Sequence, residues 1–205
     1  VQTEAAQHDV YIRLARPDMP SGEDVGSGRG HRRAQVVFPP VFDGRFARRR
    51  LTRDGTKGKS TTTVLLGRML EAGGCLVLVG GNVGTALSTQ VEQSMPEAIH
   101  VVEVSSFQLE LTATFRPWIA VFLNLYADHL DRYADIEAYA AAKARLFANQ
   151  RASDTLVVNA DDPDVLRLTR DSHAGRVAYA LREPLTEGVV VAGDTIVRRS
   201  PAGDE

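Results

Sequence analysis

The sequence predicts an α/β fold in which a parallel sheet carries helices on both of its faces. Two observations predict it. From residue 55 onward, apolar runs alternate with segments of helical periodicity, and strands that are apolar throughout are typical of a parallel sheet buried on both sides. The expected strands are 75–79, 99–104, 118–125, 155–159 and 176–181, and the expected helices are 59–72, 84–94, 136–149 and 162–171.

Each expected strand is a short run dominated by apolar residues, reading CLVLV, IHVVEV, WIAVFLNL, TLVVN and RVAYAL in chain order. Between these runs the apolar residues recur with the spacing of one helix face, which distinguishes the expected helices from the strands. The last stretch, GVVVAGDTIVRR, predicts two short strands that form a hairpin around Gly193-Asp194.

Length, charge and cysteine content narrow the class of protein. A chain of 205 residues is long enough for one domain with a true core. The net charge of −2 argues against a protein that binds nucleic acid or a membrane surface through bulk charge. The single cysteine, Cys75, cannot form an internal disulfide, and no apolar run reaches the roughly 18 residues of a membrane span. We therefore expect a cytoplasmic protein. A monomeric state is a separate expectation.

Residues 1–54 differ in composition from the rest of the chain. They hold ten arginines, no lysine and seven acidic residues, and they keep no helical or strand period. A basic arm that binds nucleic acid is disfavoured, because the segment has few aromatic residues for base stacking and no module signature. The preferred interpretation is a disordered, aberrant or frameshifted remnant that stands in place of a lost domain.

The sequence GTKGKSTTT at residues 55–63 predicts a phosphate-binding loop. Gly55 and Gly58 allow backbone N–H groups to turn towards a phosphate chain. Lys59 would reach the phosphates, Ser60 would offer its hydroxyl to Mg²⁺, and the helix that begins here adds its positive end. The alternative is a simple helix-capping loop, because Arg53 breaks the longer glycine pattern of such loops. No apolar strand is recognisable before Gly55, although a phosphate loop normally follows one.

Polar residues recur where the expected strands end. Asn82 follows the first strand in the sequence GGNVG, Glu103 ends the second, and His129 follows the third. Ligands of open α/β sheets bind beyond the carboxyl ends of the strands. Glu103 is a hard oxygen ligand suited to Mg²⁺, and His129 could bind a second cation. Glycine turns, helix caps and a solvated loop are the alternatives for each cluster taken singly.

Lys143 lies within an apolar stripe of the expected helix 136–149. The stripe consists of Ile136, Tyr139, Ala140, Leu146 and Phe147. A lysine in this position either extends its charged end to solvent or is held inside for a functional reason. The pattern by itself favours the solvent-reaching conformation. A buried neutral amine could instead react with CO₂ to form a carbamate, an anionic oxygen ligand.

Taken together, several motifs resemble the Mur ligase family in order and spacing, over roughly residues 55–183. The motifs are GTKGKSTTT, GGNVG, EVSSFQLE, FRPWIAVFLNL, DHLDRY, YAAAKARLF and VVNADDP. The resemblance implies a P-loop-type ATP-binding domain, truncated to the front part of the family's central domain. SSFQLE and the adjoining FRPW favour the branch of the family that adds D-glutamate.

The resemblance implies an ATP-dependent amide-bond ligase of peptidoglycan synthesis. ATP would phosphorylate the carboxylate of UDP-N-acetylmuramoyl-L-alanine, and the amine of D-glutamate would attack the acyl phosphate. Cations are needed because a carboxylate must approach a polyanion. ATP and Mg²⁺ are the implied cofactors, with no nucleic acid and no membrane as partner.

The resemblance also assigns roles to residues. Lys59, His129 and Lys143 would be catalytic. ATP would be bound by Gly55, Thr56, Lys57, Gly58, Lys59, Ser60 and Thr61. Metal ligands would be Ser60, Glu103, His129 and Lys143, the last as its carbamate. Substrate would be bound by Asn82, Ser105 and Gln108. The motif formed by Asn159, Asp161 and Asp162 receives no specific role.

The expected domain organisation is incomplete relative to that family. Residues 1–54 occupy the place of a domain that binds uridine diphosphate, 55–183 form the central ATP-binding domain, and 184–205 begin a hairpin region. The sequence ends before a later adenine-side motif and a C-terminal domain, so we expect the isolated chain to be inactive. The alternatives are a non-catalytic nucleotide-binding fragment, another Mur ligase, or a folylpolyglutamate synthase, the last two disfavoured by SSFQLE.

Overall fold

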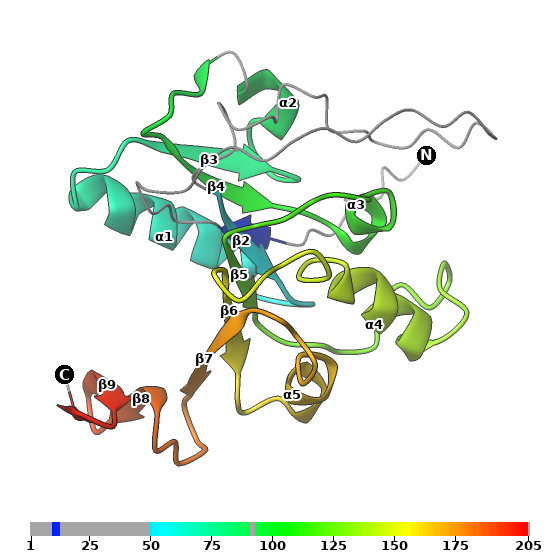
Figure 1. Ribbon diagram of the computed structural model, residues 1–205. Helices are drawn as coiled ribbons and strands as arrows, with labels where there is room; N and C mark the ends of the chain where they lie inside the picture. The colour runs from blue at the N-terminus through cyan, green and yellow to red at the C-terminus, as the bar shows by residue number, and fades with distance from the viewer. Residues whose placement is uncertain (1–9, 13–49, 91–92, 205) are drawn as a thin grey trace.

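The computed structural model describes residues 10–12, 50–90 and 93–204, and it confirms the α/β fold with a largely parallel sheet (Figure 1). The strands are β1 (Val10–Ile12), β2 (Arg50–Asp54), β3 (Val77–Gly81), β4 (Ile99–Glu103), β5 (Ile119–Phe122), β6 (Thr155–Asn159), β7 (Gly175–Ala180), β8 (Gly188–Ala192), β9 (Thr195–Ser200) and β10 (Gly203–Asp204). The helices are α1 (Lys59–Ala72), α2 (Leu87–Gln90), α3 (Ser106–Glu110), α4 (Ile136–Ala144) and α5 (Pro163–Leu168).

The parallel part of the sheet runs in the order β3, β4, β2, β5, β6, β7 and β8. β9 and β10 extend it with antiparallel pairing, and β1 also pairs antiparallel, with β4. Because β2 to β7 point the same way, their carboxyl ends meet at one edge of the sheet. In the described residues, no helix combines the length and apolar character that crossing a bilayer requires.

The strand β2 corrects the expectation that no strand precedes the phosphate loop. It lies between β4 and β5 and pairs in parallel with both, with Thr52 opposite Val102 on one side and Ala120 on the other. Thr52 is fully buried. The strand therefore forms in the middle of the sheet without an apolar sequence, because neighbours on both sides satisfy its backbone hydrogen bonds.

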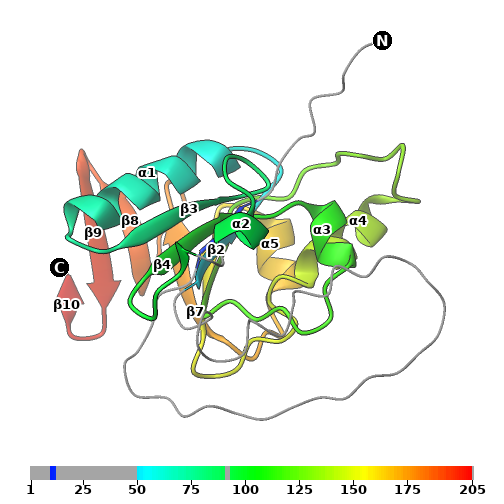
Figure 2. The same ribbon diagram turned by 90° about the horizontal axis from the view of Figure 1, so that it is seen from above.

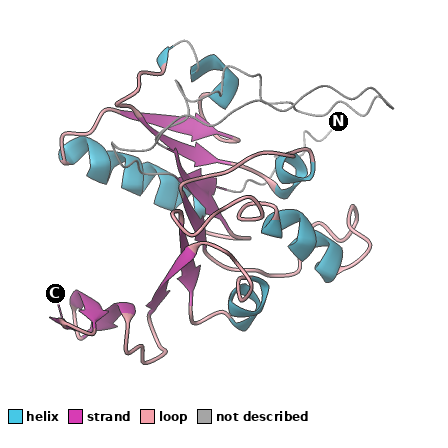
Figure 3. Cartoon of the chain, viewed as in Figure 1, coloured by secondary structure: helices cyan, strands magenta, loops and turns pink. Residues whose placement is uncertain are grey.

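Two hydrophobic clusters lie on opposite faces of the sheet. On β4, Val101 belongs to the smaller cluster, next to Leu66 and Leu70 of α1. Its neighbour Val102 belongs to the larger cluster, together with apolar residues of α3, α4 and α5, because successive side chains of a strand point to opposite faces. Figures 1 and 3 show α1 on one face and α3, α4 and α5 on the other. This arrangement confirms the prediction of helices on both faces.

The helices agree with the sequence in place but less well in length. α1 has the bounds that were expected, whereas α2, α4 and α5 are shorter than their expected segments 84–94, 136–149 and 162–171. α4 begins where the Asp135 carboxylate accepts from Ala138 N, and α5 begins at Asp162 with proline as its first residue. The five-residue α3 was not expected.

The predicted hairpin is confirmed. β8 and β9 pair antiparallel, with Ala192 opposite Thr195 across the turn at Gly193-Asp194. Gly193 has a φ of 65°, a backbone conformation that favours glycine in a tight turn. Figure 2 shows this hairpin at the opposite end of the molecule from α3 and α4.

Candidate functional site

The loop between β2 and α1 presents the open N-terminus of a 14-residue helix. Gly58 has a φ of 81° at the N-cap position, and no side chain caps the helix. In the part of the chain that the structure describes, the N–H groups of Gly58, Ser60 and Thr61 donate to no protein acceptor. Free N–H groups together with the positive end of a helix favour an anion. The predicted phosphate loop therefore has the geometry of an anion site.

Lys59 lies inside this loop. Its side chain is 6% exposed, and Nζ donates to the carbonyl of Thr56 at 2.8 Å. Because Thr56 precedes Lys59 by three residues, this hydrogen bond turns the lysine side chain back over the loop at residues 55–58. The ammonium group therefore lies against the loop backbone. A cation held at this point adds to the attraction of the helix end for a phosphate.

Glu103 and Ser60 meet at the edge of the sheet, as the sequence predicts. The carboxylate of Glu103 is at the end of β4 and is 1% exposed, and its Oε1 accepts from Ser60 Oγ at 3.4 Å. A hydroxyl and a carboxylate are the hard oxygen donors that Mg²⁺ prefers. Among the described residues no three His, Cys, Asp or Glu side chains gather as a ready-made metal site. A cation here would need further oxygen ligands, which nucleotide phosphates can supply.

Lys143 is buried, so the interpretation that it extends to solvent is wrong. Its exposed fraction is 0%, and Nζ donates to the carbonyl of Gly55 at 3.4 Å. Nζ also lies 4.7 Å from the centroid of the Tyr139 ring. α4 packs against the sheet with this face, which leaves the stem no path to solvent. The structure thus places Lys143 directly behind the phosphate loop.

His129 is connected to the loop through Tyr139 and Lys143. Its ring centroid lies 6.0 Å from that of Tyr139 and 4.9 Å from that of Phe107. His129 is also the only non-glycine residue with a positive φ in the described chain, at 53°, and histidine, asparagine and aspartate are the non-glycine residues enriched in this left-handed conformation. The aromatic contacts hold the ring in place while the backbone turns sharply.

The same aromatic cluster contains Tyr133. Its ring lies 5.2 Å from that of Tyr139 and 6.1 Å from that of Phe107. Burial raises the pKa of the Tyr133 hydroxyl to about 12, because the charged phenolate is disfavoured away from water. The ring therefore stays neutral and acts as a packing element beside His129.

The three predicted substrate residues fall into two groups. Asn82 N donates to the carbonyl of Glu103 at 2.6 Å, and its side-chain Nδ2 is buried without a hydrogen-bond partner in the described residues. Ser105 and Gln108 instead bind each other. Ser105 caps α3 by accepting from Gln108 N, and Gln108 Oε1 accepts from Ser105 N at 2.7 Å. Asn82 thus has a free donor, while the other two form a capping box.

Asn124 is one of the polar residues that end or follow the expected strand 118–125, with Asp128, His129 and Asp131, and its contacts lie in the loop before α1. Its Oδ1 accepts from the N–H groups of Thr56 and Lys57 at 2.7 and 2.9 Å, and its Nδ2 donates to the carbonyl of Lys57 at 3.0 Å. The signal in the sequence is a lone polar residue at the end of an apolar run. That signal marks the edge of the sheet but does not identify the partner.

The motif NADD, residues 159–162, makes hydrogen bonds to the segments that follow β5 and β7. Asn159 Nδ2 donates to the carbonyl of Leu123 at 2.9 Å, and Asp162 accepts from Leu125 N at 2.9 Å while capping α5. Asp161 accepts from three consecutive backbone N–H groups that follow β7, at Leu181, Arg182 and Glu183. These residues shape the segment after β5, which carries Asn124 and leads to His129.

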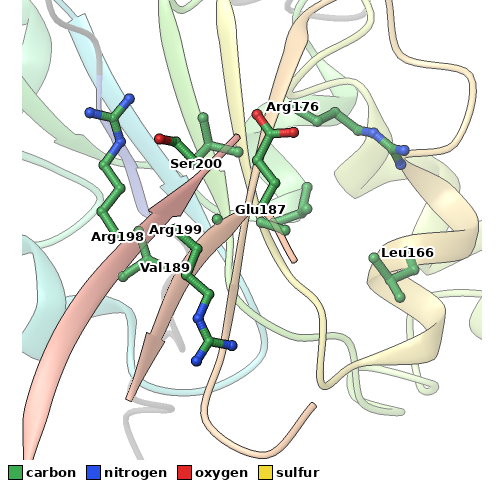
Figure 4. Close-up of a pocket in the computed structure, with 11 residues that line it drawn as sticks. Leu166, Arg176, Glu187, Val189, Arg198, Arg199 and Ser200 are labelled. Atoms are coloured by element: carbon green, nitrogen blue, oxygen red, sulfur yellow. The ribbon is translucent and has the colours of Figure 1, made fainter. Parts of the chain in front are cut away.

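A hollow of about 240 Å³ lies elsewhere, between β7, the β8–β9 hairpin and α5 (Figure 4). Val158 and Leu166 are among the described residues that line it, and these include none of the predicted site residues. Arg176, Arg198 and Arg199 point in different directions around it and do not converge on one point. The hollow is therefore separate from the loop at the edge of the sheet.

Comparisons with known proteins identify the family of this domain. Residues 54–191 match the model of the Mur ligase middle domain. A UDP-N-acetylmuramoylalanine–D-glutamate ligase of Pelotomaculum thermopropionicum is 47% identical over 143 residues, which cover 70% of this chain and 31% of that protein. The enzyme of the same name from Desulfosudis oleivorans is 44% identical over 149 residues, which cover 73% and 32%.

Solved structures give the same family. A UDP-N-acetylmuramoyl-L-alanyl-D-glutamate–2,6-diaminopimelate ligase shares 25% identity with a TM-score of 0.56, over 74% of this chain and 37% of that one. The chain thus spans about a third of the length of the curated relatives that it matches. The loop at residues 55–60, the Glu103 carboxylate and the buried Lys143 all lie within residues 54–191. Because these residues match the Mur ligase middle domain, the chain belongs to the Mur ligase family.

Proposed function

We propose that this chain supplies the ATP- and Mg²⁺-binding part of a ligase that adds D-glutamate to UDP-N-acetylmuramoyl-L-alanine in peptidoglycan synthesis. One observation carries the proposal. The Ser60 hydroxyl, 3.4 Å from Glu103 Oε1, lies in the first turn of a helix whose N-terminal amides are open. An anion site and a pair of hard oxygen ligands therefore lie side by side, as a metal-bridged nucleotide requires.

The residues of the loop would perform the electrostatic part of the reaction. The N–H groups of Gly58, Ser60 and Thr61 and the ammonium of Lys59 would hold the phosphates, and Thr56 and Lys57 would hold the loop in shape. Ser60 and Glu103 would hold Mg²⁺, which neutralises phosphate charge when bound. Less negative charge on the phosphates lets the carboxylate of UDP-N-acetylmuramoyl-L-alanine approach and become the acyl phosphate that D-glutamate attacks.

Lys143 and His129 would organise the side of the site near Gly55. In this proposal the neutral amine of Lys143 adds to CO₂, a proton leaves the nitrogen, and the carbamate becomes an anionic oxygen ligand. Its full burial and its position behind the loop support this role. Mass spectrometry of the intact protein under native conditions should show the added mass of one CO₂. Its absence in protein saturated with bicarbonate and Mg²⁺ would remove Lys143 from the ligand set.

Asn82 is the best-supported substrate residue. Its buried Nδ2 has a hydrogen to donate and no partner in the described residues, and buried polar groups are normally paired. An oxygen of the muramoyl group could accept from it. Ser105 and Gln108 would contribute as well, although they first have to keep their capping box. A cytoplasmic location and a monomeric state stay predictions.

Binding of nucleotide by the 205-residue chain tests the proposal most directly. We expect ADP to bind more tightly with Mg²⁺ than without it in calorimetric titrations. Lys59→Met should weaken binding by about tenfold or more, because a charge-assisted contact to phosphate is lost. Arg68→Met, which removes an exposed cation from the same helix, is the matched control. The proposal fails if the unmodified chain does not bind ADP at millimolar concentrations.

The second candidate is nucleotide binding without ligation by these residues. The observation that favours it is that the contacts described above serve the phosphate loop, and none within the described residues forms an evident site for D-glutamate. Release of phosphate in the presence of ATP, UDP-N-acetylmuramoyl-L-alanine and D-glutamate distinguishes the two candidates. Release that depends on both acceptor and D-glutamate supports ligation, whereas binding without release supports the second candidate.

A further inference from the structure

Asn124 joins two segments that are far apart in sequence. It lies just beyond β5, and 68 residues separate it from Thr56. Its carboxamide makes three hydrogen bonds to the backbone of Thr56 and Lys57. The orientation of the carboxamide follows from the network, because two N–H donors face Oδ1 and a carbonyl faces Nδ2. Oδ1 therefore faces only hydrogen-bond donors, and Nδ2 faces only an acceptor.

Thr56 returns the contact from the other side. Its Oγ1 donates to the carbonyl of Tyr126 at 3.2 Å and accepts from Tyr126 N at 3.0 Å. Gly55 completes the close approach, since a Cβ there would lie 2.8 Å from Leu123 Cβ and 3.2 Å from Asn124 Oδ1. The first half of the phosphate loop, residues 55–57, thus packs closely against residues 123–126, the segment that leads to His129.

These bonds divide the amides of the loop into two sets. The N–H groups of Thr56 and Lys57 are used by Asn124, whereas those of Gly58, Ser60 and Thr61 have no protein acceptor in the described residues. Without the Asn124 carboxamide, Thr56 N–H would keep only the main-chain carbonyl of Asn124 as acceptor, at 3.2 Å, and Lys57 N–H would need another acceptor. Water or a phosphate would supply it, and the loop could then adopt several arrangements.

We propose that Asn124 is a positioning residue that reserves the second half of the loop for phosphate. It holds Thr56 and Lys57 so that the amides of Gly58, Ser60 and Thr61 all face the same point. The inference rests on the proposed nucleotide binding and adds the residue that shapes the binding loop. It also predicts that the loop and the segment leading to His129 move as one unit.

The test compares ADP binding and backbone amide shifts in the full chain and in Asn124→Ala, both with Mg²⁺. In the unmodified chain the amides of Gly58, Ser60 and Thr61 should shift on addition of ADP, while those of Thr56 and Lys57 should stay near their free positions. In Asn124→Ala we expect ADP affinity to fall by about tenfold. The Lys57 amide should then respond to ADP as well, and the Thr56 amide less, because it keeps the main-chain carbonyl of Asn124 as acceptor.

Asn149→Ala is the matched control, because Asn149 also holds a loop by two bonds to backbone carbonyls, at Ala113 and Phe115. The Asn149→Ala variant should be less stable than the unmodified chain but should bind ADP equally well. This result would show that a loss of stability alone does not reduce ADP affinity. If Asn124→Ala does not fold, the amide shifts of Asn124→Asp test the same point. The carboxylate keeps an acceptor for both amides, so the Thr56 and Lys57 amides should stay near their free positions on addition of ADP, even though the added charge weakens ADP binding.

Two results would overturn the inference while leaving nucleotide binding intact. One is equal ADP affinity in the unmodified chain and in a folded Asn124 variant. The other is a large ADP-induced shift of the Thr56 and Lys57 amides in the unmodified chain. A chain that does not bind ADP at all would instead overturn the proposed function, and the inference with it.

Discussion

The hydroxyl of Ser60 lies 3.4 Å from Oε1 of Glu103, although 43 residues separate them in sequence. The parallel pairing of β2 with β4 produces this contact, because it brings the end of β4 next to the start of α1. If the pair holds Mg²⁺, the gain in ADP affinity on adding Mg²⁺ should be about tenfold smaller in Glu103→Gln than in the unmodified chain. The reason is that a neutral amide is a weaker ligand for a hard cation than a carboxylate. Titrations with and without Mg²⁺ measure the effect.

The control for this prediction is Glu137→Gln. Glu137 is exposed and pairs with Arg167 at 3.0 Å on the outer side of α4, so its neutralisation should leave Mg²⁺ dependence unchanged. Binding of ADP in the absence of Mg²⁺ should be equal or slightly stronger in Glu103→Gln, because one negative charge near the phosphates is removed. An unchanged Mg²⁺ dependence in this variant would exclude Glu103 as a ligand.

Lys143 gives a prediction that separates stability from activity. Methionine removes the cost of burying the amine but also its contacts with the Gly55 carbonyl and the Tyr139 ring, so the free energy of unfolding should change by no more than about 1 kcal/mol in either direction. Ligase turnover in the full-length enzyme should fall by about a hundredfold or more if Lys143 takes part as its carbamate. Lys143→Arg keeps a cation but forms no such carbamate, so full activity in that variant would contradict the role.

The expected strands and helices agree with the fold wherever local pattern decides the structure. Apolar runs became β3 to β7, and the turn at Gly193-Asp194 became the hairpin. β2 could not be predicted, because RLTRD has no strand pattern and its place depends on pairing with β4 and β5. α3 was not expected, because five residues are too few to show a helical period. Its capping box joins Ser105 and Gln108, and binding of substrate by these two residues stays a prediction.

The sequence predicts which polar residues gather at this edge of the sheet but not the contacts that they make. Sequence placed Glu103 at the end of a strand and Ser60 at the start of a helix, and parallel pairing of the sheet then brought them together. The burial of Lys143 and the contacts of Asn124 are tertiary properties. A single lysine in an apolar stripe is compatible with both conformations, and the partner of an asparagine 68 residues away has no local signature.

Asp161 should make stability depend on pH. Burial opposes its ionisation, but hydrogen bonds from the N–H groups of Leu181, Glu183 and Arg182 outweigh that effect, so the pKa of this carboxyl lies below its ordinary value. A lowered pKa gives stability that is present above the unfolded pKa of about 4 and is lost as pH falls through the folded pKa. Asp161→Asn should therefore unfold more easily at about pH 7, by about 1–2 kcal/mol, and lose less on acidification.

Urea unfolding at neutral and acidic pH measures this difference. Asp171→Asn is the control, because Asp171 is an exposed carboxylate in the turn that follows α5 and should change neither quantity by much. Equal acid sensitivity in Asp161→Asn and in the unmodified chain would show that the three hydrogen bonds to Asp161 do not favour its charged form.

The ion pair between Arg116 and Asp154 should contribute more to stability than any exposed pair. Arg116 binds both carboxylate oxygens, at 2.6 and 3.1 Å, and the Asp154 side chain is only 2% exposed. Removing one partner leaves the other charge buried, so Arg116→Met should cost about 2–4 kcal/mol. The pair between Arg132 and Glu110 is as short, at 2.7 Å, but Arg132 is half exposed, and Arg132→Met should cost less than about 1 kcal/mol. Chemical unfolding of both variants tests the contrast, and equal costs would show that burial of Asp154 does not govern the strength of its pair.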